Sequence, residues 1–481
     1  MIFNSLNFLI FFTIVFLIYW RLNHNAQNIF LLLGSYFFYA CWDWRFLFLI
    51  LIPTTVDFFC ARAIHRVRNG LQKKIFLWCA IAVDLAILFF FKYFNFFIDN
   101  LGALLRAIGI GNLSHFHLNV ILPLGISYYL FKSISYIIDV YREVIKEPTR
   151  NILHYALYLS FFPQLLAGPI ERAVHFLPQL SRPRVFKKEY FLNSFYLIFW
   201  GFFKKVFIAD NLAPLIESIF HPLVSPSGFD ILLGAYATTF KLYADFSGYS
   251  DMAIGIAGCL GFTTMPNFNL PFFAENPADI WRRWHISLSS WCRDYVYYYA
   301  NRLMVWLRIA GGKGIAVAMV ITMCIMGLWH QASWPFIFWG IYHGTLLSMQ
   351  VFIRWLLVKF HYVKRTANNF LLTLFKIVFT FHLFVLGTTI RNAATGKDLL
   401  SSLHCVFCQF KVTRLSLMLL GGMTFYIGIL ISLETIQYIH KDQLIVRKLN
   451  PWIKGFIYFI LLLMLVSGGM EGGRPFVYMQ Y

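Results

Sequence analysis

The chain has 481 residues, of which 59% are hydrophobic and 13% charged, and its mean hydropathy is +0.65. A soluble globular domain carries about 25% charged residues, so the composition excludes an ordinary soluble domain. The formal net charge is +20 and is concentrated in connecting segments. Such basic loops are typical of the cytoplasmic side of membrane proteins. We therefore expect membrane lipids, and no nucleic acid, as partners of these charges.

Apolar runs recur along the whole chain, from 7–20 to 452–468. A helix that crosses a bilayer needs about 20 apolar residues, and several runs are long enough. Others, such as 119–131, are short or interrupted by Gly and Pro, as in re-entrant segments enclosed by protein. The sequence predicts an all-α, polytopic integral membrane protein with about 11 to 13 transmembrane or re-entrant helices. Residues 1–20 lack a basic segment and a cleavage site, so we expect them to remain as the first span.

The chain shows no internal repeat and no long polar linker. We therefore predict one integral membrane domain over 1–481, with a catalytic core at about 120–350 and C-terminal helices and an aromatic tail at 369–481. Cysteine usage gives no support to a metal centre, because only Cys405 and Cys408 have C-x-x-C spacing and no second ligand pair accompanies them. We expect no metal.

The segment "WRRWHISLSSWCRD" at 281–294 is unusually basic and aromatic for such an apolar chain. Pro277 and Asp279 before it are typical of a helix start. At about 100° per residue, one continuous amphipathic helix would carry an aromatic face. That face comprises Trp281, Trp284, His285, Leu288, Trp291, Cys292 and Tyr295. An interfacial anchor without chemistry is the simpler interpretation, but a titratable histidine on the aromatic face favours a catalytic role for His285.

A second histidine, His330, interrupts the apolar run at 324–344. Ionisable residues within a membrane are costly and indicate function, and histidine takes and returns protons near neutral pH. His343 lies roughly 220° further round if the helix is continuous, which favours a structural role.

A third polar stretch, at 243–255, places Asp245, Ser247 and Asp251 among small residues. It indicates close helix packing or a water-filled passage. These residues alone leave two classes open: a transporter with a polar lumen, and a transferase with an intramembrane site.

Motifs distributed over most of the chain resemble one known family. They are "LPLGISYYLFKSISYIIDVYR" at 122–142, "FFPQLLAGPIER" at 161–172, "DFSGYSDMAIG" at 245–255, "NFNLPFF" at 267–273, "ENPADIWRRWHISLSSWCRDYVY" and "GLWHQASWPFIFWGIYHG". The chain is thereby identified as similar to the membrane-bound O-acyltransferases. The most similar branch is that of alginate O-acetyltransferases, which is related to the membrane subunit that D-alanylates teichoic acids.

The resemblance implies transfer of acyl groups from a cytoplasmic donor across the bilayer, with His330 as the catalytic residue and His285 as the second catalytic histidine. The second histidine would polarise the carbonyl or relay the proton. It further implies acetyl-CoA as donor substrate with no bound cofactor, and an exported or cell-wall polysaccharide as acceptor. An extracytoplasmic serine-hydrolase-like partner protein and a bacterial cytoplasmic (inner) membrane location follow in the same way. A glycan or acyl-carrier flippase and a protein-modifying acyltransferase remain the alternatives.

Further candidates surround this core. Arg283 and Arg293 are either anchors for a phosphate-bearing donor or lipid contacts. The full set of donor-binding or channel-lining candidates is Trp281, Arg283, Trp284, Ser289, Arg293, Asp294, Asp245, Ser247, Asp251 and Trp329. The chain ends "RPFVYMQY", and resemblance to an aromatic tail motif makes Tyr478 a candidate acyl relay, against the alternative of an interfacial anchor.

Three positions and one stretch depart from the family pattern. Gln331 replaces a glycine, Lys132 replaces a glutamine, and Tyr481 replaces a terminal phenylalanine; of the motif around 384–395, only Arg391 is retained.

Overall fold

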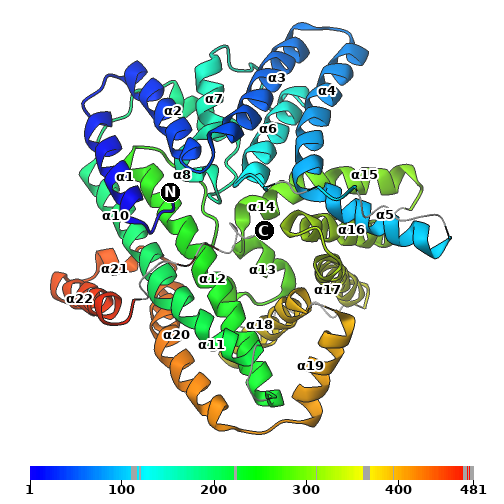
Figure 1. Ribbon diagram of the computed structural model, residues 1–481, viewed down its shortest axis with the longest axis vertical. Coiled ribbons are helices and arrows are strands. Elements are labelled where there is room, and N and C mark those ends of the chain that lie inside the picture. The colour runs from blue at the N-terminus through cyan, green and yellow to red at the C-terminus, as the bar shows by residue number, and fades with distance from the viewer. Residues whose placement is uncertain are drawn as a thin grey trace. The chain divides into compact units, whose positions relative to one another are not determined.

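A computed structural model describes residues 1–109, 116–118, 121–220, 225–309, 311–360, 369–393, 395–469, 474 and 476. Throughout these residues the regular structure is helical (Figure 1). The chain forms two compact units, one made of residues 1–195 with 253–265 and the other of 196–252 with 266–481. The expected all-α architecture is confirmed.

The first unit holds the N-terminal helices and the start of α10. Their bounds are α1 Leu6–Tyr19, α2 His24–Ala40, η1 Trp44–Phe46, α3 Leu47–Arg66, α4 Gly70–Leu88, η2 Phe89–Tyr93, α5 Phe94–Ala107, α6 Ile126–Tyr141, α7 Ile152–Ser160, α8 Phe162–Leu165, α9 Ala173–Leu180 and α10 Lys188–Phe203. Helix α6 is buried from Ile126 to Val140. Lys132 on this helix donates to Gln164 at 3.1 Å and lies 4.7 Å from the ring of Tyr158, so its ammonium group has a polar partner and an aromatic face.

The second unit contains both histidines of interest. Its elements are η4 Lys204–Ala209, α11 Asp210–Phe220, α12 Gly228–Cys259, η5 Pro271–Phe273, α13 Pro277–Arg283, α14 Ile286–Trp291, η6 Cys292–Tyr297, α15 Tyr298–Trp306, α16 Gly312–His330, α17 Trp334–Lys359, α18 Phe370–Asn392, α19 Gly396–Cys408, α20 Arg414–His440, α21 Ile445–Lys448 and α22 Pro451–Gly468. Helices α10 and α12 continue from one unit into the other.

Helices α16 and α17 form the close-packed pair that carries His330 and His343 (Figure 1). A Cβ atom at Gly327 would lie 2.1 Å from the carbonyl oxygen of Phe336, and one at Gly340 would lie 2.4 Å from that of Met323. Only glycine permits so close a backbone approach, as at many membrane helix crossings. The two helices are therefore held at a fixed spacing beside the site.

Eight helical stretches within the described residues are long and apolar enough to cross a membrane. They are Trp44–Arg66, Gly70–Ala107, Lys188–Ile219, Gly312–His330, Trp334–Lys359, Phe370–Asn392, Arg414–His440 and Pro451–Gly468, with the shorter apolar helix Leu6–Tyr19 in addition. The expected 11 to 13 segments also counted short and re-entrant ones. The chain is a multi-pass membrane protein.

Candidate active site

The segment that carries His285 is not one helix. Helix α13 ends at Arg283 and α14 begins at Ile286, while His285 adopts the left-handed conformation with φ 43° and ψ 52°. The predicted continuous helix over 281–295 is therefore wrong, and so is the single aromatic face derived from it. Residues other than glycine rarely adopt this backbone conformation, and such backbone strain is concentrated at functional sites.

A short adjacent segment replaces the helical hydrogen bonds at the break. Ile286 donates its backbone N–H to the carbonyl of Asn267 at 2.8 Å, and Asn269 donates to the carbonyl of Arg283 at 2.9 Å. Asn276 caps the start of α13 by accepting from the N–H of Asp279, and Pro277 and Asp279 lie in its first turn. Segment 267–269 thus holds both sides of the turn at His285.

His285 is almost entirely buried, with 1% of its surface exposed. Its Nδ1 lies 3.0 Å from the side-chain oxygen of Asn267, and its ring meets Phe246 edge to face at 4.6 Å. His285 lies outside the eight candidate spans, and burial lowers its pKa from the ordinary 6.5 to about 3. The imidazole is therefore neutral at physiological pH, which is the form that accepts a proton.

His330 is the last residue of α16, followed by the extended residue Gln331. Its ring lies 6.4 Å from that of His285, measured between centroids. Trp329 at 4.8 Å and Trp339 at 5.5 Å surround the same imidazole. The two histidines singled out in the sequence are thus brought together at the end of a helix.

His343 lies on a separate helix from His330, because α16 ends at His330 and α17 begins at Trp334, with Pro335 in its first turn. The assumption of a continuous helix through this region is wrong. The ring of His343 packs against Trp281 at 5.2 Å and Trp339 at 4.9 Å, and a Cβ at Gly387 would lie 2.3 Å from its Nε2. These contacts describe a tightly packed core residue.

One cavity, of about 420 Å³, follows the face of α16 that ends at His330. Met319, Met323 and Met326 line it, and His330 comes one turn further on the same face. Two cationic side chains, Arg282 of α13 and Arg293 of η6, also line it. The lining thus combines apolar side chains of α16 with two cationic side chains from other elements.

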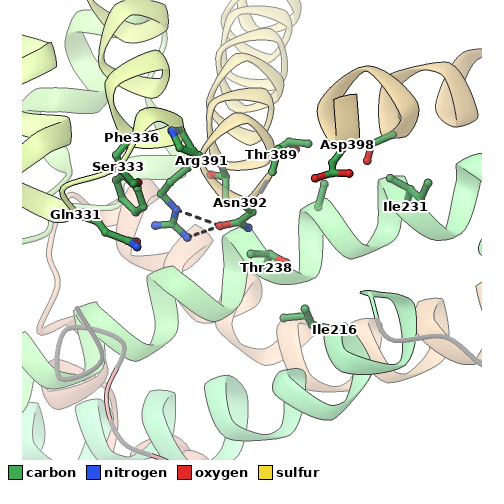
Figure 2. A pocket seen from close by; sticks show the side chains of 15 residues that line it. Ile216, Ile231, Thr238, Gln331, Ser333, Phe336, Thr389, Arg391, Asn392 and Asp398 are labelled. Carbon is green, nitrogen blue, oxygen red and sulfur yellow. Dashed lines mark hydrogen bonds between the residues drawn. The ribbon is translucent and has the colours of Figure 1, made fainter. Parts of the chain in front are cut away.

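A larger cavity, of about 850 Å³, lies where α16 gives way to α17. Its walls also include residues of α11, α12, α18 and α19. Gln331 and Ser333 lie toward one end and Asp398 toward the other, with Arg391 and Asn392 between them (Figure 2). Arg391 donates to the side-chain oxygen of Asn392 at 3.2 and 3.1 Å. The lining combines hydroxyl, amide and charged groups, and Gln331 belongs to it.

The acidic residues of the stretch 243–255 are paired with lysines of η4. Lys204 lies 2.7 Å from Asp251 and donates to Ser247 at 2.9 Å. Lys205 lies 2.7 Å from Asp245 and 2.9 Å from Asp210. The structure therefore places Asp245, Ser247 and Asp251 in two ion-paired groups between η4 and α12.

The other candidates fall into three environments. Trp281, Ser289 and Arg293 line the smaller cavity. Trp284 and Trp329 are buried among aromatic rings. Arg283 pairs with Asp279 at 2.8 Å, and Asp294 pairs with Arg293 at 2.8 Å.

Sequence reasoning passed over Arg282 and Asn267. Arg282 lines the smaller cavity, although it lies outside the aromatic face expected for a continuous helix. Tyr478 and Tyr481 lie outside the described residues. The tail is represented by Arg474, which pairs with Glu217, and by Phe476, which is buried. No group of three or more His, Cys, Asp or Glu side chains that could hold a metal occurs among the residues described.

The architecture is that of a multi-pass membrane protein in which two buried or helix-end histidines lie 6.4 Å apart, ring to ring, and one of them follows a helix that lines a cavity. The model of the membrane-bound O-acyltransferase family matches residues 142–389, which include both histidines. The chain is 40% identical over 360 residues to the probable alginate O-acetylase AlgI of Azotobacter vinelandii, covering 74% of this chain and 69% of the relative. It therefore belongs to the membrane-bound O-acyltransferase family and is an acyltransferase.

Two other relatives carry different acceptors in their names. The peptidoglycan O-acetyltransferase of Helicobacter pylori is 33% identical over 413 residues, covering 78% of this chain and 75% of that protein. The teichoic acid D-alanyltransferase of Bacillus subtilis is 30% identical over 280 residues, covering 56% and 68% respectively. The chain spans about two thirds of the length of the alginate O-acetylases it matches, from 66% to 70%.

Proposed function

We propose that this acyltransferase is an O-acetyltransferase of the bacterial cytoplasmic membrane. It takes acetyl groups from cytoplasmic acetyl-CoA and supplies them, across the bilayer, for O-acetylation of an exported or cell-wall polysaccharide. The observation that carries the proposal is the position of His330 at the end of α16, where it follows Met326, which lines the smaller cavity, and precedes Gln331, which lines the larger one. The names of the alginate and peptidoglycan relatives support acetyl as the group transferred.

Charge supports a cytoplasmic position for the start of α16. Arg308 and Lys313 flank the start of α16, and Arg354 and Lys359 occupy the end of α17. The opposite connection, 331–333, contains no lysine or arginine. Because basic residues accumulate in cytoplasmic loops, α16 runs outward and His330 lies at its outer end.

The smaller cavity suits an acyl-CoA donor. Arg282 and Arg293 match the negative charge of nucleotide phosphates, which guanidinium groups bind through paired hydrogen bonds. The methionines along α16 present flexible, polarisable side chains that adapt to a narrow alkyl arm such as pantetheine. The thioester would then reach His330 at the end of the methionine-lined face.

The reaction balances with one histidine as proton carrier. The acceptor oxygen attacks the thioester carbonyl while its proton passes to a nitrogen of His330. When the C–S bond of the tetrahedral intermediate breaks, that proton passes to the leaving thiolate, which gives an ester, a thiol and a neutral imidazole. A positioned general base contributes about 10²- to 10⁴-fold to such a step.

The larger cavity suits a hydroxyl-bearing acceptor on the far side, because Arg391, Asn392 and Gln331 provide donors and acceptors for sugar groups. An extracytoplasmic serine-hydrolase-like protein would complete delivery to the polymer. Tyr478 is the proposed relay: its phenolic oxygen would take the acetyl group from the thioester, and a second hydroxyl would then displace the phenolate and return its proton.

The test is transfer of label from radiolabelled acetyl-CoA into polymer and into protein, with membranes that carry equal amounts of each variant. His330→Ala should lose at least about 100-fold, as expected for removal of a general base. His440→Ala serves as control, because His440 is exposed at the end of α20. A transporter without chemistry would tolerate loss of His330 and His285, so retained label in both variants would contradict the proposal. Label that ended in protein alone would indicate a protein-modifying enzyme.

A further inference from the structure

The amide group of Asn267 has an orientation that its hydrogen bonds determine. Ser287 donates both its backbone N–H, at 3.3 Å, and its hydroxyl, at 2.9 Å, to the Oδ1 of Asn267. A backbone N–H is an obligatory donor, so the atom it meets must be the amide oxygen. On the other side, the NH₂ group of Asn267 donates to the hydroxyl of Ser250 at 2.9 Å. The usual ambiguity between amide oxygen and nitrogen is therefore removed.

This orientation fixes the tautomer of His285. Its Nδ1 lies 3.0 Å from the same Oδ1 of Asn267, an atom that accepts and never donates. Nδ1 must therefore carry the proton. In a neutral imidazole only one nitrogen is protonated, so the lone pair of His285 is on Nε2.

A lone pair at Nε2 restricts what neutral His285 can do. It can accept a proton or a hydrogen bond, but it has no N–H at Nε2 to donate to a developing oxyanion. We propose that Asn267 is a positioning residue that holds His285 in the Nδ1–H tautomer, so that Nε2 acts as proton acceptor in acyl transfer. The inference rests on the proposed function. Of the two roles considered for His285, polarising the carbonyl and relaying the proton, it selects the second.

The spacing of the two imidazoles agrees with a proton-accepting role for His285. A direct hydrogen bond between the rings would bring their centroids to roughly 5 Å, because its N···N distance is about 2.9 Å. The observed 6.4 Å exceeds this distance, so the rings do not bond to each other directly, and the separation matches a hydroxyl held between the two nitrogens. The acceptor's hydroxyl is then held between two nitrogens, its proton passes to one of them as its oxygen attacks, and that proton leaves with the thiolate as before.

The surroundings of His285 make Asn267 the group that sets its protonation. Helix α12 presents Phe246 at 4.6 Å, and helix α16 presents Trp329 at 5.8 Å and the titratable His330. The two carboxylates of α12 that are close to Phe246 in the sequence, Asp245 and Asp251, each form an ion pair with a lysine. A carboxylate introduced at 267 would therefore be a new charge beside the Nδ1–H.

The experiment compares Asn267→Asp and Asn267→Leu with wild type in labelled acetyl transfer over a range of pH. Aspartate keeps the size and the oxygen that accepts from Nδ1, and the Ser250 hydroxyl can turn to donate to it. Its charge stabilises the imidazolium, so the acidic limb of the pH–rate profile should move to higher pH by at least one unit. Leucine keeps the size but removes the acceptor, and should lower transfer about 100-fold without moving that limb.

Asn450→Asp is the matched control. Asn450 caps α22, where aspartate serves equally well, so its profile should superimpose on that of wild type. A second readout is independent of turnover: ¹⁵N solid-state NMR of histidine-labelled protein should contain an Nδ1–H resonance that disappears in His285→Asn.

The outcomes distinguish a failure of the proposed function from a failure of the positioning role of Asn267. Absence of transfer in wild type would contradict the proposed function and leave the NMR result to decide the tautomer. Transfer in wild type with an unshifted profile in Asn267→Asp would overturn the positioning role. An Nε2–H resonance for His285 would overturn it as well.

Discussion

The imidazole rings of His285 and His330 lie 6.4 Å apart, one on a strained left-handed residue and the other at the last position of a membrane helix. Each histidine is held by a different device: His285 by Asn267, and His330 by the close contact of α16 with α17. Because different contacts hold the two histidines in place, they act as one catalytic unit only if both interact with the same proton.

If both histidines act on the same proton, the losses of acetyl transfer in their single variants should not be additive in the double variant. His285→Asn and His330→Gln should each lower acetyl transfer by about 10²- to 10⁴-fold, because each removes a proton acceptor. The double variant should be no slower than the slower single variant, as is typical of residues that act together. Initial rates of labelled transfer would measure this. Losses that multiply in the double variant would mean that the histidines act in separate steps.

The two arginines of the smaller cavity should act on donor affinity. Arg282→Ala and Arg293→Ala should raise KM for acetyl-CoA about tenfold each with little change in kcat, because they bind phosphates that take no part in the reaction. With acetyl-pantetheine, which lacks the nucleotide, the variants and wild type should have similar KM values. Arg354→Ala, an exposed residue at the end of α17, is the control. Equal effects on both donors would place the arginines elsewhere.

The sequence supported some of these features well and others poorly. His330 could be predicted because an ionisable group in an apolar run costs free energy, and this signal is visible within the run itself. Arg282 was missed because helical periodicity assumes an unbroken helix, whereas the break at His285 depends on Asn267 and Asn269, which are brought alongside by the fold. A turn that is stabilised from outside its own segment leaves no periodic signal.

The same limit applies to the acidic stretch. Asp245 and Asp251 indicated either close helix packing or a water-filled passage, because their spacing on α12 does not reveal the lysines of η4. Two adjacent lysines within an apolar segment were the available signal, since a buried cation requires a partner. Helix propensity and hydropathy treat each segment alone, and these ion pairs exist only between segments.

The Lys204–Asp251 pair gives a stability prediction. The lysine side chain is 3% exposed and the aspartate 18% exposed. Lys204→Met should cost about 3 to 5 kcal/mol, because it leaves a carboxylate without its partner in a largely buried place. Lys204→Met combined with Asp251→Leu should recover most of that loss, since an apolar pair needs no desolvation. Thermal denaturation in detergent would measure both. A double variant as unstable as the single one would show that Asp251 does not depend on Lys204.

Stability should also fall on acidification because of His285. Its pKa is about 3 in the folded protein and about 6.5 when exposed, so between these values the unfolded chain binds a proton that the folded chain does not. The contribution of neutral His285 is therefore complete above about pH 6.5 and is lost progressively as the pH falls toward 3. His285→Asn removes the titrating group, and asparagine tolerates the left-handed backbone. The decrease in Tm from pH 7.5 to pH 5 should be smaller in the variant, and equal decreases would contradict the assignment.

The C-terminal tail provides the last prediction. Phe476 is 1% exposed, its ring meets that of Tyr249 edge to face at 4.7 Å, and the Nζ of Lys205 lies 4.5 Å from its centre. A desolvated cation–aromatic contact contributes up to about 2 kcal/mol, so the tail is anchored two residues before Tyr478.

Tyr478→Phe separates anchoring from chemistry. It keeps the ring and removes the oxygen, so a relay predicts a loss of at least about 100-fold, comparable to that for a removed nucleophile. Peptide mapping after labelled acetyl-CoA should find a base-labile acetyl ester on Tyr478 in wild type and none in the variant. If Tyr478→Phe transfers acetyl to the polysaccharide at the wild-type rate, the tail is an anchor only, and the acceptor hydroxyl must reach the thioester at His330 directly.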